Sequence, residues 1–430
     1  MRRTLSKIYQ KFSLVWKYRF SLGKKVDWFR SHERLPVTEF TAVRNQLLSD
    51  ILDHAVHSVP YYQNLLRQGL VTPREDPLQC LAAFPLQTRI TIQSQKDQLV
   101  SAAVPKSELF ANSTGGSTGK PTQFYQDKRY QQYRKALEYR NLLWCGWSFG
   151  DPHLKIWGSY FDLNMQMRLQ GRITNWLNNM VIFPASRMYT EKMDEWIDQL
   201  YRIRPVVLEG YVNALVTFAK YIRSIDRAPI DAGIRAIITA AETLLPDQRS
   251  LLQEVFNSKV FNRYGCREFA CIAHECEHGT LHINEDWVYL EVVDGEGNPV
   301  PDGETGQIVI TNFFNRGMPF IRYAIGDIGA LPKVHQSCPC GLPFRYLKSL
   351  EGRLLDVIVL PKSGYTSGTQ IGNVFGPHDI DRYQVIQDQV DHINVLIVPG
   401  KDYGVDDERV LRDKLALYLP GINIDITYVD

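Results

Sequence analysis

The chain has 430 residues, 44% of them hydrophobic and 22% charged, and a formal net charge of +2. This composition is typical of a globular protein with two or more cores, and the near-neutral charge excludes a strongly basic nucleic-acid-binding protein. No apolar run approaches the roughly 18 residues of a membrane-spanning helix, and the N-terminus lacks a continuous apolar segment of the signal-peptide type. Seven cysteines in such a chain favour free thiols or a metal site over disulfides. We therefore expect a cytoplasmic protein.

The first predicted element is a basic amphipathic segment at 1–40. Residues 1–25 hold eight Lys or Arg and no Asp or Glu, and Leu5, Ile8 and Phe12 recur at steps of three and four. This spacing puts the apolar side chains on one face of a helix. The helix either docks on the body of the protein or lies on an anionic membrane surface, which would place the protein at the inner face of the membrane.

Helices and strands then alternate along the chain. Residues 41–58 are predicted as a helix that ends before Pro60, and 124–146 as a longer helix that follows a glycine-rich run. The strands predicted next are 153–161, 179–185, 205–211 and 234–242, and the helices between and after them are 190–203, 213–225 and 244–256. This alternation predicts a parallel or mixed sheet with helices on its faces.

The last third of the chain changes character. Residues 287–294 and 307–311 flank a turn-rich loop and predict antiparallel strands. Three further elements predict a small β-α-β lid: a strand within 384–400, a helix at 406–419 and a strand at 422–429. We place a domain boundary at 353–356, which gives domains of 41–352 and 353–430.

The glycine-rich run at 111–121 reads ANSTGGSTGKP. Glycines let backbone N–H groups approach phosphate oxygens closely, hydroxyls add donors, and Lys120 adds charge. The run is not a Walker A loop, because the position that needs the first glycine holds Thr114, and Pro121 follows the lysine. It predicts a phosphate-binding loop, with an unliganded polar surface loop as the alternative.

Four motifs in register resemble those of the adenylate-forming enzymes, the acyl-CoA synthetase superfamily. They are STGGSTGKP at 113–121, YGCRE at 264–268, RYAIGD at 322–327 and GRLLD at 352–356. Across about 40–430 the chain resembles, more narrowly, the phenylacetate–CoA ligase branch and the CapK-like proteins of polysaccharide gene clusters. The resemblance implies an α/β fold: a large N-terminal adenylate-forming domain with mixed sheets flanked by helices, and a small C-terminal α+β lid.

The resemblance also implies a reaction. A carboxylate attacks the α-phosphorus of ATP, which gives an acyl-adenylate and pyrophosphate, and the acyl group then passes to CoA, another carrier thiol or an amine. The implied partners are ATP, Mg²⁺, a small carboxylic acid and the acyl acceptor, with no nucleic acid, in a setting of surface polysaccharide biosynthesis. The resemblance does not identify the carboxylic acid.

The resemblance implies functional residues at the positions of this sequence that match the superfamily's motifs. The implied catalytic residues are Glu268, Lys120 and Arg353, and Glu268 also helps to bind Mg²⁺, which prefers oxygen ligands. Asp327 accepts hydrogen bonds from the ribose hydroxyls. The other implied nucleotide-binding residues are Ser113, Thr114, Gly115, Gly116, Ser117, Thr118, Gly119, Ala241, Glu242, Thr243, Tyr264 (stacked on adenine), Gly265 and Arg353.

Each assignment has a structural alternative. Asp327 could serve only its Gly-Asp turn, Glu268 could be a surface acid, and Arg353 could pair across the domain interface. Tyr211 and the Trp144–Trp147 region are candidates for the acyl pocket, but such aromatics are more often core residues, and we leave them unassigned.

A second constellation predicts a structural zinc site that staples the loops 270–285 and 335–345 together. Three thiolates and one imidazole would complete a closed tetrahedral Zn²⁺ site, although generic zinc-finger spacings are not matched. The expected ligands are Cys276, His282, Cys338 and Cys340. His278 is the alternative histidine, and the Cys/His set carried by several members of the resembled branch supports the prediction.

The chain departs from the superfamily at two points. Arg267 stands where the superfamily has a hydroxyl residue before the glutamate. The adenylation lysine is expected close to the C-terminus, but the last lysine printed is Lys414, within a predicted helix. The alternative function is therefore a nucleotide-binding pseudoenzyme or scaffold that lacks this lysine.

Overall fold

The computed structural model describes Thr4 and residues 22–72, 76–113, 122–157, 173, 175–333, 337–353, 357–361, 365–367, 371, 374–375, 378–401 and 403–429. Leu5, Ile8 and Phe12 of the expected amphipathic helix lie outside these residues. The described part of the N-terminal segment is α2 (Leu22–His32), which packs against α7 (Lys128–Trp144). Over the described ranges, none of the helices is both long and apolar enough to cross a membrane.

The largest sheet has seven strands in the order β4-β3-β5-β6-β7-β8-β9. The strands are β3 (His153–Trp157), β4 (Met180–Pro184), β5 (Val207–Tyr211), β6 (Ala236–Ala240), β7 (Lys259–Cys266), β8 (Ala270–Glu275) and β9 (Leu281–Ile283). The first five are parallel, whereas β8 and β9 run antiparallel. The predicted mixed sheet is therefore confirmed.

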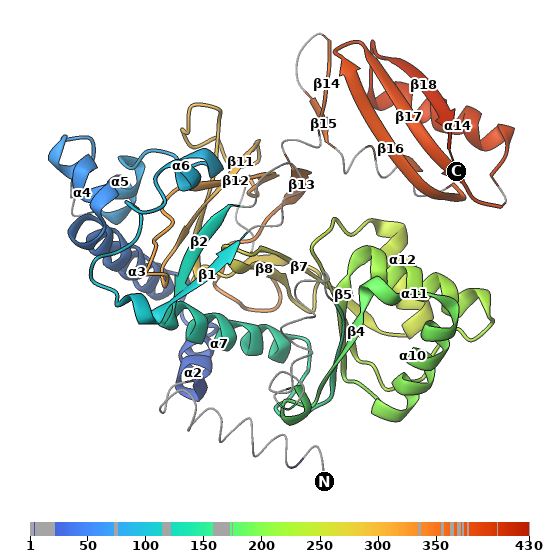
Figure 1. Cartoon of the computed structure of the whole chain (residues 1–430), viewed down its shortest axis with the longest axis horizontal. Helices are drawn as coiled ribbons and strands as arrows, with labels where there is room; N and C mark the ends of the chain where they lie inside the picture. Colours follow the sequence, from blue (N-terminus) through green and yellow to red (C-terminus); the bar gives the residue numbers. More distant parts are fainter. Residues whose placement is uncertain are drawn as a thin grey trace.

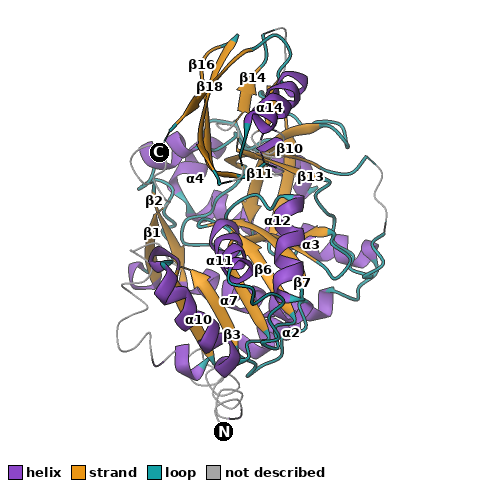
Figure 2. Cartoon of the chain, turned by 90° about the vertical axis from the view of Figure 1, so that its right-hand side faces the viewer, coloured by secondary structure: helices purple, strands orange, loops and turns teal. Residues whose placement is uncertain are grey.

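Helices cover both faces of this sheet (Figures 1 and 2). On one face lie α10 (Thr190–Ile203), α11 (Val212–Ser224) and α12 (Pro246–Phe256), and α7 lies on the other. The apolar stripes of α10–α12 share a core with the strands, because both sides present Leu, Ile, Val and Phe to each other. Pro246 occupies the first turn of α12, where its missing N–H costs little.

A second, four-stranded sheet is antiparallel throughout. Its strands follow chain order as β10 (Val288–Val293), β11 (Thr305–Asn312), β12 (Tyr323–Ala330) and β13 (Ser349–Arg353). Four N-terminal helices belong to the same large domain: α3 (Val37–Ser58), α4 (Pro60–Arg67), α5 (Pro77–Ala82) and α6 (Arg89–Ser94). Helix α3 ends before Pro60 as predicted but begins at Val37, four residues before the predicted start.

The prediction of one helix over 124–146 is wrong at its start. Residues Gln123–Asp127 form β2, which pairs with β1 (Leu109–Ser113) on the other side of the glycine-rich run. Helix α7 begins only at Lys128, where the Asp127 carboxylate accepts a hydrogen bond of 2.7 Å from the Tyr130 N–H. This cap and the pairing with β1 together override the helical periodicity.

The small C-terminal unit has a core of its own. It holds β14 (Val357–Val359), β15 (Tyr365–Ser367), β16 (Ile380–Gln389), β17 (His392–Pro399), α14 (Val405–Tyr418) and β18 (Asn423–Tyr428), at the red end of the chain in Figure 1. Strands β17 and β18 are parallel with α14 between them, as the β-α-β prediction requires. The single strand predicted within 384–400 is instead a hairpin, because Gln389 pairs with His392 across a two-residue turn.

A buried ion pair joins the N-terminal helix to the body. The Arg140 guanidinium, from α7, donates to Asp286 at 3.2 and 3.3 Å and to Asn284 Oδ1 at 2.7 Å, and both charged side chains are fully buried. Its planar group also lies 5.3 Å from the ring centre of Phe29, in α2, and 4.6 Å from that of Trp144. Trp144 therefore belongs to this core rather than to an acyl pocket.

We predict that Arg140→Met lowers the free energy of unfolding by about 3–5 kcal/mol, because the buried Asp286 carboxylate loses its guanidinium partner and retains, among the described residues, the contact of 3.3 Å with His32 Nδ1. Urea denaturation followed by circular dichroism measures the change. Lys128→Met, in the same helix, removes an exposed pair with Glu108 and should cost less than about 1 kcal/mol. Equal effects of the two substitutions would contradict the assignment.

Candidate functional site

Two of the four sequence motifs meet through a hydrogen bond between the two sheets. The Tyr264 hydroxyl, on β7, donates to Asp327 Oδ2, on β12, at 2.7 Å. Asp327 is also the register partner of Arg353, the last residue of β13. Gly326 and Gly352 both have positive φ, of 84° and 100°, which explains the glycine in each motif. The side chain of Arg353 and all of Asp356 lie outside the described residues.

The strands that bracket the glycine-rich run are tied to the Glu268 turn. Gln126, on β2, donates to the backbone carbonyls of Arg267 at 3.0 Å and Glu268 at 3.3 Å, and its own carbonyl accepts from Asn112, on β1, at 3.2 Å. The Tyr130 hydroxyl donates to the Glu268 carbonyl at 2.8 Å. The two segments therefore hold a fixed relative position.

The carboxylate of Glu268 faces the second sheet. Burial, followed by the charge of Glu268 and a hydrogen bond to it, raises the pKa of the Tyr323 hydroxyl well above its ordinary value. Ser113, the last residue of β1, is the only member of the predicted phosphate loop that the structure describes. Thr114, Gly115, Gly116, Ser117, Thr118, Gly119 and Lys120 lie outside the described residues.

Gly265 is required by a close approach of two backbones. A Cβ at this position would overlap the carbonyl group of Ala270 on the paired strand β8. The β7–β8 register also shifts between Tyr264 and Gly265, which turns the end of β7 toward the second sheet. The glycine thus allows the bulge that brings Tyr264 to Asp327.

The segment Ala241, Glu242 and Thr243 follows β6 at the carboxyl end of the parallel strands and is exposed. Ala241 has a φ of 71°, a left-handed conformation that turns the chain sharply away from the strand. Glu242 Oε2 accepts a hydrogen bond of 2.7 Å from the Asn213 N–H in the first turn of α11. This carboxylate therefore stabilises a helix N-terminus, which the sequence did not indicate.

The first residue of the RYAIGD motif has a structural role. Arg322 is buried with a φ of 49°, and its guanidinium forms an ion pair of 3.1 Å with Glu291. It also donates to the carbonyls of Gly297 at 2.7 Å and Phe84 at 3.1 Å. Arg322 thus fixes the start of β12, whereas Asp327, further along the strand, reaches the site.

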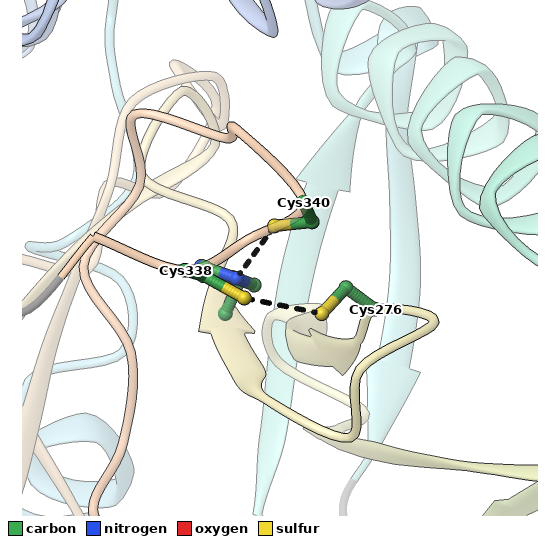
Figure 3. Close-up of side chains that lie close together, drawn as sticks. Cys276, Cys338 and Cys340 are labelled. Carbon is green, nitrogen blue, oxygen red and sulfur yellow. Dashed lines mark hydrogen bonds between the residues drawn. The ribbon is translucent and has the colours of Figure 1, made fainter.

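The predicted metal ligands come together (Figure 3). One ligand atom from each of Cys276, His282, Cys338 and Cys340 lies within 4.8 Å of the others. Two sulfur atoms, those of Cys276 and Cys338, are 3.7 Å apart, and Cys340 Sγ is 3.2 Å from His282 Nε2. Tetrahedral Zn²⁺ with Zn–S bonds of about 2.3 Å requires sulfur atoms about 3.8 Å apart. The donor set and spacing fit such an ion.

Hydrogen bonds outside the cluster also suit a metal. His282 Nδ1 lies 3.0 Å from the carbonyl oxygen of Phe344, so that a proton on Nδ1 leaves Nε2 as the ligand atom. The backbone N–H of Ile283 donates to the Arg345 carbonyl at 2.9 Å, which joins the two loops next to the cluster. His278 is outside the cluster and pairs with Glu277 at the surface.

Comparisons with known proteins agree with this architecture. No protein-family profile matches the chain. The chain is 24% identical over 371 residues to Protein CapK from Staphylococcus aureus, which covers 84% of this chain and 78% of CapK. It is 26% identical over 371 residues to phenylacetate-coenzyme A ligase from Thermus thermophilus, covering 82% of this chain and 79% of the ligase. The predicted resemblance is confirmed.

The fold is that of a solved acyl-CoA ligase. The structure of 2-hydroxyisobutyryl-CoA ligase in its postadenylation state matches with a TM-score of 0.75 at 17% identity, over 93% of this chain and 87% of that one. The same ligase in its thioesterification state matches with a TM-score of 0.64. The predicted fold class, a large mixed α/β domain with a small C-terminal unit, is therefore confirmed.

We predict that Gly265→Ala destabilises the protein by about 1–3 kcal/mol or more, because the new methyl group must displace the Ala270 backbone. Thermal unfolding measures the loss. Gly23→Ala is the matched control: nothing lies within 4 Å of its added Cβ, and an alanine in α2 should stabilise by up to about 1 kcal/mol. A Gly265→Ala protein as stable as the wild type would contradict the close-approach argument.

Proposed function

We propose that the protein activates a carboxylic acid with ATP as an acyl-adenylate and then transfers the acyl group to CoA or another thiol or amine. The observation that carries this proposal is the hydrogen bond between Tyr264 and Asp327, with Arg353 as the register partner of Asp327. These residues come from three separate motifs and meet near the carboxyl ends of parallel strands, where ligands bind in open α/β sheets. The similarity to phenylacetate-coenzyme A ligases supports the same reaction class.

The described residues suit the nucleotide. An ionised Asp327 only accepts hydrogen bonds, which matches the two ribose hydroxyls, and the Tyr264 hydroxyl fixes the orientation of that carboxylate. We assign the Tyr264 ring and the exposed segment 241–243 to the adenine. Ser113 begins the loop 113–121, whose backbone N–H groups and Lys120 we assign to the β- and γ-phosphates.

Glu268 is the proposed magnesium ligand. Its backbone carbonyl accepts hydrogen bonds from Gln126 and Tyr130, which ties its turn to the strand and helix that follow the phosphate loop. A divalent cation bound there would offset negative charge on the phosphates during attack at the α-phosphorus. Arg353 is proposed to bind the ribose or a phosphate from the boundary between the two domains.

The lid is proposed to alternate between two half-reactions about the boundary at 353–356. The higher TM-score with the postadenylation state than with the thioesterification state supports assigning the present lid position to the adenylation half. CoA is the favoured acceptor, since phenylacetate-coenzyme A ligases are among the relatives. The resemblance to CapK favours surface polysaccharide biosynthesis as the setting, close to the inner face of the membrane.

The second candidate is a nucleotide-binding protein without ligase activity. Lys414 lies within α14 and is half-buried, whereas the resemblance implies an adenylation lysine in a Gly-Lys context. Both candidates predict ATP binding at Asp327, and only the first predicts chemistry.

Zn²⁺ is the proposed structural metal of the Cys276, His282, Cys338 and Cys340 cluster. All four positions are protein ligands, so a tetrahedral ion would have no open site for catalysis. Its contribution would be to lock the β8–β9 hairpin to the loop that precedes Arg345. Because β8 pairs directly with β7, this would stabilise the strand that carries Tyr264.

We predict that ATP–pyrophosphate exchange with pooled carboxylic acids falls about 10- to 100-fold in Asp327→Ala, because a hydrogen bond to a charged group contributes about 1.5–3 kcal/mol. Asp231→Ala, at a carboxylate that is 95% exposed, should keep the wild-type rate. Exchange by the wild type that survives Asp327→Ala would contradict the ribose assignment. Binding of Mg-ATP without any exchange would favour the second candidate.

We predict one zinc ion per chain in the purified protein, measured by inductively coupled plasma mass spectrometry. His282→Ala should lose most of the metal and lower the melting temperature, whereas His278→Ala should retain it. Dialysis against a strong chelator should lower the melting temperature of the wild type in the same direction. Metal-free wild type that is as stable as the metal-loaded protein would refute a structural metal.

A further inference from the structure

The two faces of the parallel sheet differ in polarity. Toward α10–α12, the strands β3 and β5 present Leu154, Ile156 and Leu208, which are fully buried. Toward α7, the alternating positions hold the ionisable side chains Lys155 and Glu209. The same face carries His153, Trp157, Tyr211 and Arg263. A covered sheet face is normally apolar, so this face calls for another explanation.

Ion pairs link the charged side chains of this face into one continuous network. Glu209, which is 1% exposed, forms an ion pair of 2.6 Å with Arg263 Nη1 through one oxygen and another of 2.9 Å with Lys155 Nζ through the other. Lys155 also bonds Glu138 of α7 at 3.1 Å, and Glu138 bonds Lys135 at 2.9 Å. Replacing such a buried network with apolar residues is often neutral or stabilising, so stability alone does not account for it.

The network carries an excess of positive charge. Burial opposes ionisation of Glu209, but Arg263 and Lys155 outweigh it and hold the pKa of Glu209 well below its ordinary value. Burial lowers the pKa of His153, despite its contact with Glu209, so the imidazole is neutral at pH 7. The network therefore has five charged residues, of which three are cations and two are carboxylates. The cations are Lys135, Lys155 and Arg263, and the carboxylates are Glu138 and Glu209.

Among the described residues, two of the cations have more N–H donors than carboxylate partners. A guanidinium has five N–H donors, yet Glu209 is the one ion-pair partner that Arg263 has among the described residues. Lys155 has three donors and two carboxylate partners. Although both lie deep in the protein, their side chains are 22% and 14% exposed, so each borders an accessible space. They lie 5.3 and 5.8 Å from the ring centre of Trp157.

These side chains lie at the sheet edge that also carries Tyr264. Trp157 ends β3 and Tyr211 ends β5, and their ring centres are 4.4 Å apart at the carboxyl edge of the parallel strands. Arg263 directly precedes Tyr264 on β7, so their Cα atoms are about 3.8 Å apart. A molecule that reaches the α-phosphate from the α7 side would pass the Trp157 ring and meet these two cations.

We propose that Arg263 and Lys155, beside Trp157, bind a second anionic group on the carboxylic acid that is activated, so that the substrate class is a dicarboxylic or similarly dianionic acid. This inference rests on the proposed function, because it assigns the far end of the same substrate. Glu209 and His153 are positioning residues that hold the two cations in place. A neutral acyl chain would leave the donors of both cations without a partner in a poorly hydrated site, which penalises it.

The test compares matched acids that differ in one terminal group. The pairs are 4-carboxyphenylacetate with 4-methylphenylacetate, and glutarate with pentanoate, in ATP–pyrophosphate exchange with the full chain. We expect the diacid of at least one pair to have a kcat/KM at least tenfold higher, mostly through KM. Arg263→Gln should reduce this ratio to within about twofold. Arg249→Gln, which breaks an ion pair with Glu275 at the opposite face of β7, should leave it unchanged.

A binding measurement separates the two levels of the proposal. Calorimetric titration of 4-carboxyphenylacetate or glutarate in the presence of AMP measures binding without requiring the reaction. If the glutamine variant fails to fold, Arg263→Lys is used in its place, because it keeps the positive charge. Diacid binding that Arg263→Lys weakens, without any exchange, would support the subsite and refute the reaction. Exchange with the neutral acids at equal or higher efficiency would overturn the subsite and leave the reaction standing. Absence of both diacid binding and ATP–pyrophosphate exchange would refute both the subsite and the reaction.

Discussion

The hydrogen bond between Tyr264 and Asp327 is the constraint on which the rest of the site depends, because it ties a motif residue of the seven-stranded sheet to a motif residue of the four-stranded sheet. Helices α7 and α10–α12 cover the seven-stranded sheet, whereas antiparallel strand pairing holds the four-stranded sheet together. The β7–β8 register shifts between Tyr264 and Gly265, and a Cβ at Gly265 would overlap the Ala270 carbonyl group. The motif glycine is thus explained by backbone crowding rather than by ligand contact.

Much of this architecture could be predicted from local patterns. Buried parallel strands such as Ala236–Ala240 are mostly apolar, and the helices between them are amphipathic, so the type of each element and its place along the chain could be predicted from the sequence. Three of the motifs hold Tyr264, Asp327 and Arg353, whose strands the structure brings together. The sequence failed where pairing decides conformation: Gln123–Asp127 becomes a strand because β1 lies opposite, and 384–400 folds back at Val390–Asp391.

The long-range polar contacts were beyond sequence reasoning for a different reason. Arg140 lies 146 residues from Asp286, and Gln126 lies 142 from Glu268, so no periodicity links the partners. Nor did a pattern identify the charged face of the sheet, since a single Lys or Glu within an apolar strand reads as an exposed position. The cysteine and histidine cluster was predictable because two short spacings, Cys-x₅-His and Cys-x-Cys, each form a compact turn.

The separate core of the C-terminal unit has an energetic consequence. Its buried apolar side chains, such as Ile393, Val395 and Leu411, contact one another and not the cores of the large domain. A rigid-body rotation of this unit therefore exposes little of its own apolar surface, so two orientations can differ by only a few kcal/mol. A ligand that contacts both parts needs only a modest difference in affinity to change which orientation is populated. A separate core thus lets the small unit keep its own packing in whichever orientation it takes.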